Sequence, residues 1–172
     1  MNQAIPLPYR ILLLMAGFIS LGIGIETGLL RLGWNFPLPS SNLAAFHGPL
    51  MISGFLGTVI ALERAVAVGQ RWAYLGPFCA ALGGLALVIG ANWIIGAGLM
   101  ILASVFLLLA SANIFFRQHA LFTFTLLLGS IFWFAGNVLW MDGIAISQVT
   151  PWWIGFLVIT IAGERLEMTR ML

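Results

Sequence analysis

The sequence is poor in charged residues and contains no lysine. Only 7% of its 172 residues are charged and 62% are hydrophobic, whereas a soluble domain is usually about 25% charged and about 45–50% apolar. So few charges cannot cover a soluble surface of ordinary polarity. The formal net charge is only +2, which is too small a basic excess to predict nucleic-acid binding.

Cysteine and the common catalytic signatures are also scarce. Cys79 is the single cysteine and lies in an apolar run, so the sequence excludes an intrachain disulfide and a thiolate metal cluster. The sequence has no P-loop, no C-x-x-C, no H-E-x-x-H and no G-x-S-x-G. These absences remove the usual signs of nucleotide, redox and hydrolase chemistry and leave the question of enzymatic activity open.

Long hydrophobic runs are what the sequence does contain. A helix needs about 20 apolar residues to cross a hydrocarbon core about 30 Å thick, and turn residues divide the chain into six runs near that length. We therefore predict an all-α, polytopic membrane protein with a single domain, a bundle of six transmembrane helices. The expected spans are residues 9–32, 42–68, 73–90, 93–116, 121–141 and 151–170, the last with Pro151 in its first turn.

The arginines predict how this bundle is oriented. With the N-terminus inside, only Arg31 falls on the outer side, and the other arginines fall at cytoplasmic ends. This positive-inside bias predicts that both termini are cytoplasmic. An interfacial aromatic belt is expected on the opposite side, formed by Trp34, Trp93, Trp140, Trp152 and Trp153.

Small residues recur at intervals of four in the first two spans. This spacing lets helices approach closely, because packing contacts replace the hydrophobic driving force in lipid. It predicts helix–helix contact faces at Gly24 and Gly28, and at Ser53, Gly57, Ala61 and Ala65.

Ionisable side chains within spans are costly and are candidates for function. Glu26 and His47 have similar expected depths on adjacent antiparallel helices, so the carboxylate can orient the imidazole. Met51 follows His47 by four residues on the same helix face, and Asn137 is expected nearby.

Two interpretations of these residues follow. In one, His47 is a haem or copper ligand, with Met51 as a second cofactor ligand; in the other, His47 ties helices together through Glu26 and Met51 is a packing residue. An aromatic-walled space is predicted beside this face, at Trp133, Gly136 and Trp140.

Two Glu-Arg pairs stand at the cytoplasmic ends of their helices. Glu63 precedes Arg64 in the second span, and Glu164 precedes Arg165 in the sixth. One interpretation is a set of ion pairs that closes the bundle while the arginines reach the interface. The other is an entry point for protons.

Two stretches resemble the NnrS family of membrane proteins. Residues 47–55 (HGPLMISGF) resemble the early His-x-x-x-Met helix of that family, and residues 153–170 resemble the helix that ends its first half. The resemblance implies a bacterial-type inner (plasma) membrane protein that binds haem and copper and is linked to respiration or nitric oxide stress, with His47 as a haem or metal ligand. Family members have more helices and several intramembrane histidines. The chain is therefore expected to be an N-terminal half or a truncated reading frame. A second axial ligand would come from another copy or another membrane subunit, or the haem would be five-coordinate.

Two other classes of function are compatible with the same residues. A transporter or channel subunit would line a path with Glu26, His47 and Asn137. A scaffold or assembly subunit would hold no cofactor and would use its small-residue faces and tryptophans for packing. In all three cases the expected partners are the lipid bilayer and either a second copy of the chain or a different membrane subunit.

Overall fold

The computed structural model describes residues 5–34 and 41–169, and every element in these ranges is helical. This confirms the all-α prediction for the described part of the chain. The elements in chain order are α1 (Leu7–Arg31), η1 (Ser41–Phe46), α2 (His47–Pro49), η2 (Leu50–Leu56), α3 (Gly57–Val68), η3 (Arg71–Tyr74), α4 (Leu75–Val88), α5 (Trp93–Arg117), α6 (Leu121–Met141) and α7 (Ile146–Met168).

Six of the helical segments in the described ranges are long and apolar enough to cross a membrane, as the hydrophobic runs predict. Two of them are composite: Leu43–Val68 joins η1, α2, η2 and α3, and Arg71–Val88 joins η3 and α4. The six segments have 18 to 26 residues, close to the length that a bilayer core requires.

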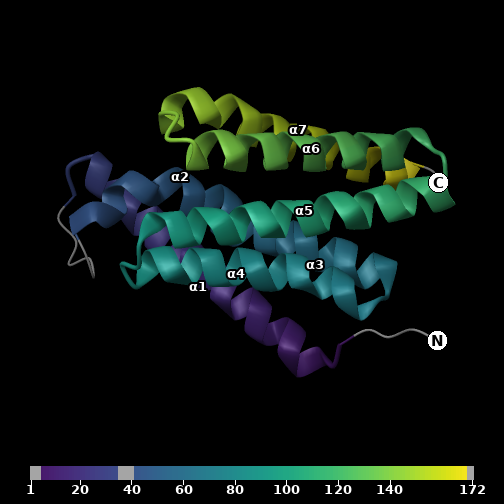
Figure 1. The fold of residues 1–172 in the computed structure, drawn as a ribbon, viewed down its shortest axis with the longest axis horizontal. Helices are drawn as coiled ribbons and strands as arrows, with labels where there is room; N and C mark the ends of the chain where they lie inside the picture. The colour runs from purple at the N-terminus through teal and green to yellow at the C-terminus, as the bar shows by residue number, and fades with distance from the viewer. Residues whose placement is uncertain (1–4, 35–40, 170–172) are drawn as a thin grey trace.

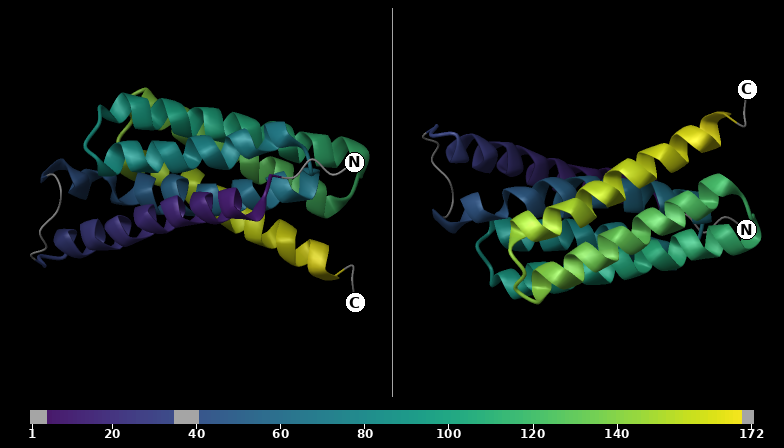
Figure 2. Two further views of the ribbon diagram at one scale, coloured as in Figure 1. Left: turned by 90° about the horizontal axis from the view of Figure 1, so that it is seen from below. Right: turned by 90° about the horizontal axis from the view of Figure 1, so that it is seen from above.

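The helices form an elongated bundle in which successive long helices alternate in direction (Figure 1). α4, α5, α6 and α7 pack along one another in order, while α1 packs against η2 and α4. α1 and α7 run obliquely to the other helices (Figure 2). The described chain begins and ends at the same end of the bundle, which we call the arginine-rich end. Its arginines are Arg10, Arg64, Arg71, Arg117 and Arg165.

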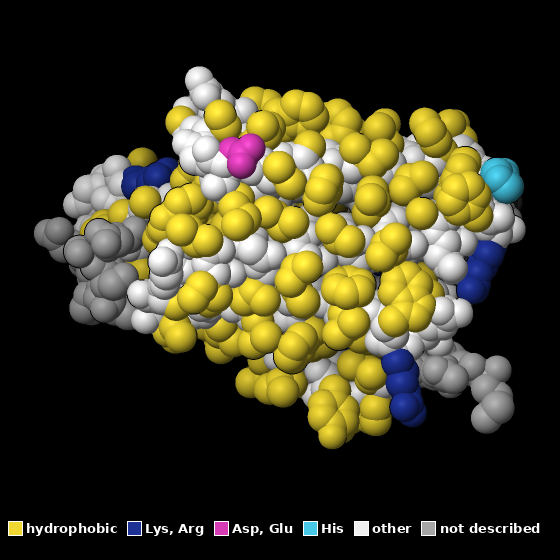
Figure 3. All heavy atoms as spheres, viewed as in Figure 1, with side chains coloured by type: hydrophobic (Ala, Val, Ile, Leu, Met, Phe, Trp, Pro, Cys, Tyr) yellow, Lys and Arg dark blue, Asp and Glu magenta, His cyan; other side chains and the backbone are white. Residues whose placement is uncertain are grey.

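The polarity of a soluble protein is reversed in this bundle. Figure 3 shows a face covered by hydrophobic side chains over the middle of the bundle, with the charged side chains near its two ends. Phe18 and Val158 are more than half exposed, whereas Ser20, Thr27 and Ser104 are fully buried. Small and polar residues therefore mediate contacts between helices and large apolar residues face outward, an arrangement suited to lipid. The predicted contact faces at Gly24 and Ser53 are both buried, as expected.

The second span is one rod with three kinds of helical winding, whereas the sequence predicts one regular helix over 42–68. It begins as a 3-10 turn, passes through α2, widens into a π-helix over Leu50–Leu56 and returns to α-helix at Gly57. Pro49 lacks a backbone N–H, so the regular hydrogen-bond ladder cannot run through this segment without adjustment. π-helical segments are rare and often occur at functional sites.

The last helix begins earlier than predicted. We expected Pro151 in its first turn, but α7 starts at Ile146 and Pro151 lies inside it. The hydroxyl of Thr150 donates a hydrogen bond of 2.7 Å to the carbonyl of Ile146, which helps the polar segment before the proline to remain helical. The prediction was wrong because a proline in the second turn removes one ladder bond but does not prevent a helix from starting upstream.

Candidate functional site

His47 begins α2 and lies directly against α1. Its Nδ1 is 2.7 Å from the carbonyl oxygen of Gly24. The ring covers Gly28, where an added Cβ would lie only 2.8 Å from Cε1 of the imidazole. The absence of a side chain at Gly28 therefore makes the space in which the imidazole sits.

The hydrogen bond to Gly24 determines which ring nitrogen carries the proton. A carbonyl oxygen can only accept, so Nδ1 of a neutral His47 must be the protonated nitrogen. Nε2 then keeps its lone pair. An imidazole that is held through Nδ1–H by a backbone carbonyl is the arrangement commonly found when Nε2 binds a metal.

Met51 also faces α1, one helical turn from the imidazole. An added Cβ at Gly24 would lie 2.8 Å from the sulfur of Met51. His47 and Met51 thus share a face, as their spacing predicts, and the two glycines of α1 accommodate one side chain each. Nδ1 of His47 is already hydrogen-bonded to the Gly24 carbonyl, so it is not available to bind a copper ion together with the Met51 sulfur. The arrangement therefore favours a ligand bound at Nε2.

Glu26 does not orient His47, contrary to one of our interpretations. The carbonyl of Gly24 takes that role, and among the described residues no hydrogen bond or ion pair is found for the carboxylate. The reason is helical geometry. Glu26 lies two residues after Gly24 and therefore about 200° around the helix from it, away from the face that meets the second span.

Asn137 belongs to a different cluster, buried between helices and four residues before the end of α6. Its Oδ1 accepts hydrogen bonds from Oγ of Ser53 at 3.0 Å and from Nε1 of Trp153 at 3.1 Å. Its Nδ2 donates to the carbonyl of Met100 at 3.0 Å, and Trp133 Nε1 donates to Ser53 Oγ at 3.0 Å. All five residues are fully buried. We call them the central polar cluster; it joins η2, α5, α6 and α7.

The aromatic-walled space predicted beside Asn137 is filled by the protein itself. An added Cβ at Gly136 would lie 2.7 Å from Cδ1 of Trp153, so the indole occupies the room that the glycine leaves. Trp133 stacks on Phe156 with ring centroids 5.1 Å apart. Trp153 and Trp140, expected in an interfacial belt, are instead 0% and 4% exposed. The central polar cluster is therefore a closed structural element, and it was missed because a buried tryptophan and an interfacial one look alike in sequence.

Arg64 joins α3 to α7 at the arginine-rich end. Its guanidinium lies 3.5 Å from Glu63, 3.9 Å from Glu164 and 3.8 Å from Glu167, and its side chain is only 7% exposed. The predicted role of Glu63, Arg64 and Glu164 in closing the bundle agrees with this geometry. Arg165 is exposed and outside the cluster.

Glu167 is the member of this cluster that sequence reasoning missed. It lies three residues after Glu164 and hence on the same helix face, whereas Arg165 is one residue on and points about 100° away. The signal was the i, i+3 spacing of the two glutamates, which the adjacent Glu-Arg pair obscured.

The described residues contain no group of three or more His, Cys, Asp or Glu side chains that could hold a bare metal ion. Haem makes a smaller demand, because the macrocycle supplies four equatorial nitrogens and the protein adds only one or two axial ligands. A single imidazole with a free Nε2 can supply one of these axial ligands. The second histidine, His119, is exposed and packs on Phe115 in the connection after α5, far from α2 along the bundle.

These features define a class: an all-helical bundle with six candidate membrane spans, a closed polar centre and one histidine held at a glycine face. The chain belongs to the family defined by a domain of unknown function, DUF8744, whose model matches residues 10–172. Comparisons with curated proteins and with solved structures gave no match.

Proposed function

We propose that this protein is a multi-pass membrane protein that binds haem through Nε2 of His47. The observation that carries the proposal is the 2.7 Å contact between His47 Nδ1 and the Gly24 carbonyl, because it leaves Nε2 as the free nitrogen. A bound haem would supply redox or gas-binding chemistry, and its remaining axial position would be open or taken by another copy or subunit. The resemblance of residues 47–55 to the NnrS family favours a role in respiration or nitric oxide stress.

Insertion in a bilayer with both termini inside is part of the same proposal. The support is the apolar exterior and the gathering of arginines at one end. In a Cys79→Ser background, His119→Cys should react with a membrane-impermeant maleimide only after cells are opened, and Ser147→Cys should react in intact spheroplasts. The reverse pattern would invert the orientation, and recovery of the protein from the aqueous fraction without detergent would exclude insertion.

A transport path is less well supported than a cofactor site. Such a path needs polar groups through the full depth of the bundle, but Ser53 and Asn137 are fully buried and bonded to two tryptophans. This part of the bundle interior is therefore occupied by side chains that satisfy one another.

The haem proposal is tested by absorption spectroscopy of protein purified in detergent from cells supplied with haem precursor, with iron and copper measured on the same sample. We expect a Soret band that His47→Ala abolishes and His119→Ala leaves unchanged. Gly28→Ala should shift or weaken the band, because its new Cβ displaces the imidazole. A wild-type protein without a Soret band would refute the proposal, whether or not it holds copper, as would equal losses in the two histidine variants.

A further inference from the structure

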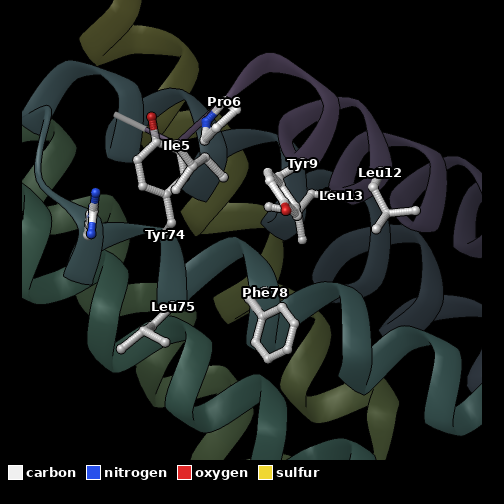
Figure 4. Close-up of a pocket in the computed structure, with 9 residues that line it drawn as sticks. Ile5, Pro6, Tyr9, Leu12, Leu13, Tyr74, Leu75 and Phe78 are labelled. Atoms are coloured by element: carbon white, nitrogen blue, oxygen red, sulfur yellow. The ribbon is translucent and has the colours of Figure 1, made fainter. Parts of the chain in front are cut away.

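A pocket of about 550 Å³ opens between the first turns of α1 and the beginning of α4 (Figure 4). Its apolar walls are Leu12 and Leu13 on one side and Leu75 and Phe78 on the other. Both helices start at the arginine-rich end and run in the same direction from it. The volume lies within the range of about 300–1,000 Å³ that is usual for small-molecule sites.

The pocket opens on the apolar outer surface of the bundle. Leu12 is 64% exposed and Phe78 48% exposed, so the walls continue into the surface that faces lipid in the proposed arrangement. A ligand that enters from the side must therefore carry an apolar chain. Figure 4 shows Tyr74 beside Ile5 and Pro6, with Tyr9 and Leu13 across the pocket from it.

Tyr74 is the first sign that the ligand also has a polar part. It lines the pocket and is only 5% exposed, yet its hydroxyl has no hydrogen-bond partner among the described residues. A buried hydroxyl is rarely left unpaired, because it has lost its bonds to water without replacement. The structure therefore offers a donor for an acceptor that the described part of the chain does not supply.

The charges around this hydroxyl are positive. Arg71 also lines the pocket, is exposed, and has no ion pair among the described residues. The guanidinium of Arg10 lies 5.8 Å from the centroid of the Tyr74 ring, and its Nε is bonded to the carbonyl of Ile5 at 3.0 Å. No carboxylate lines the pocket in the described part of the chain, so the complementary ligand is an anion.

We infer that this pocket binds one anionic phospholipid, with its phosphate at Arg71 and the Tyr74 hydroxyl and an acyl chain along the walls at Leu13 and Phe78. The inference rests on the membrane insertion proposed above and is independent of haem at His47. Anionic lipids are enriched in the cytoplasmic leaflet, which is where the arginine-rich end is proposed to lie.

The test is native mass spectrometry of the full chain in detergent, titrated with phosphatidylglycerol and, separately, with phosphatidylcholine. We expect one retained phosphatidylglycerol with at least about tenfold preference over phosphatidylcholine. Both lipids offer a phosphate to Arg71, but the choline ammonium cancels that negative charge and is repelled by the arginines around the pocket. Arg71→Gln should remove most of that preference. Arg117→Gln is the matched control, with the same charge change at the same end outside the pocket, and it should change binding by less than about twofold.

Tyr74→Phe separates a binding role from a structural one. Without added lipid, it should leave the thermal midpoint unchanged or slightly raised, because the hydroxyl it removes has no partner. Phosphatidylglycerol should then raise the midpoint of the wild type by more than that of the variant. Destabilisation of the lipid-free variant would mean that the hydroxyl is bonded within the chain and would overturn the inference.

Two further outcomes would overturn it. One is equal retention of both lipids, which indicates a general lipid shell, and the other is an equal effect of Arg71→Gln and Arg117→Gln. The haem proposal can fail without affecting this result, because His47→Ala should leave phosphatidylglycerol binding intact. Recovery of the protein from the aqueous fraction without detergent would count against both.

Discussion

Removal of the Asn137 amide should be among the most damaging polar substitutions in the bundle. The side chain is fully buried and makes three hydrogen bonds to other elements. Interhelical hydrogen bonds in membrane proteins contribute on average about 0.6 kcal/mol each, which gives about 2 kcal/mol for three. Asn137→Ala also leaves the Ser53 hydroxyl and the Trp153 indole N–H without an acceptor, each at a cost of about 1 kcal/mol or more. We therefore expect a loss of about 2–4 kcal/mol.

The assay is unfolding by sodium dodecyl sulfate in mixed micelles, followed by tryptophan fluorescence. Trp133 and Trp153 bond directly to the central polar cluster, so their emission should report its opening. Asn113→Ala is the matched control, because Asn113 Oδ1 is buried and has no partner among the described residues. That variant should change stability by less than about 0.5 kcal/mol or should stabilise the protein.

A double-mutant cycle then separates the bonds from the cavity. Ser53→Ala and Asn137→Ala remove the two ends of one hydrogen bond at 3.0 Å, so their effects should be non-additive by about 1 kcal/mol. Equal destabilisation by Asn137→Ala and Asn113→Ala, or strict additivity in the cycle, would refute the reasoning that the central polar cluster acts as a connected unit.

Two further predictions concern packing and charge, each checked in the same unfolding assay. Gly57→Ala should destabilise the bundle by about 1–3 kcal/mol, because its Cβ would overlap the Trp133 ring. Gly22→Ala, which has nothing within 4 Å of its Cβ, should instead stabilise the bundle by about 0.5–1 kcal/mol. Similar values for the two variants would contradict the contact with Trp133. Arg64→Gln should cost about 1–2 kcal/mol, reduced from the value for a buried pair because the carboxylates are 33–55% exposed. Arg165→Gln should be neutral, and an effect as large as that of Arg64→Gln would show that net charge alone matters.

The candidate site shows where local spacing stops being informative. Spacing along one helix predicts a shared face, and it correctly placed His47 and Met51 toward the same neighbour. It does not predict the rotation of that neighbour, so it could not show that α1 turns the Gly24 carbonyl, and not the Glu26 carboxylate, toward the imidazole. The π-helical turn adds a second difficulty, because each extra residue in a turn rotates the residues after it by about 100°.

The sequence by itself determined the helical class, the number and approximate limits of the long apolar segments, and the small-residue faces on which they meet. These follow from composition and period, which act within a single segment. Tertiary structure decided the partners: Gly24 for His47, Ser53 and Trp153 for Asn137, and Glu167 for Arg64. Each of these contacts joins two different helices, so it depends on their relative rotation and depth, which only the packed bundle fixes.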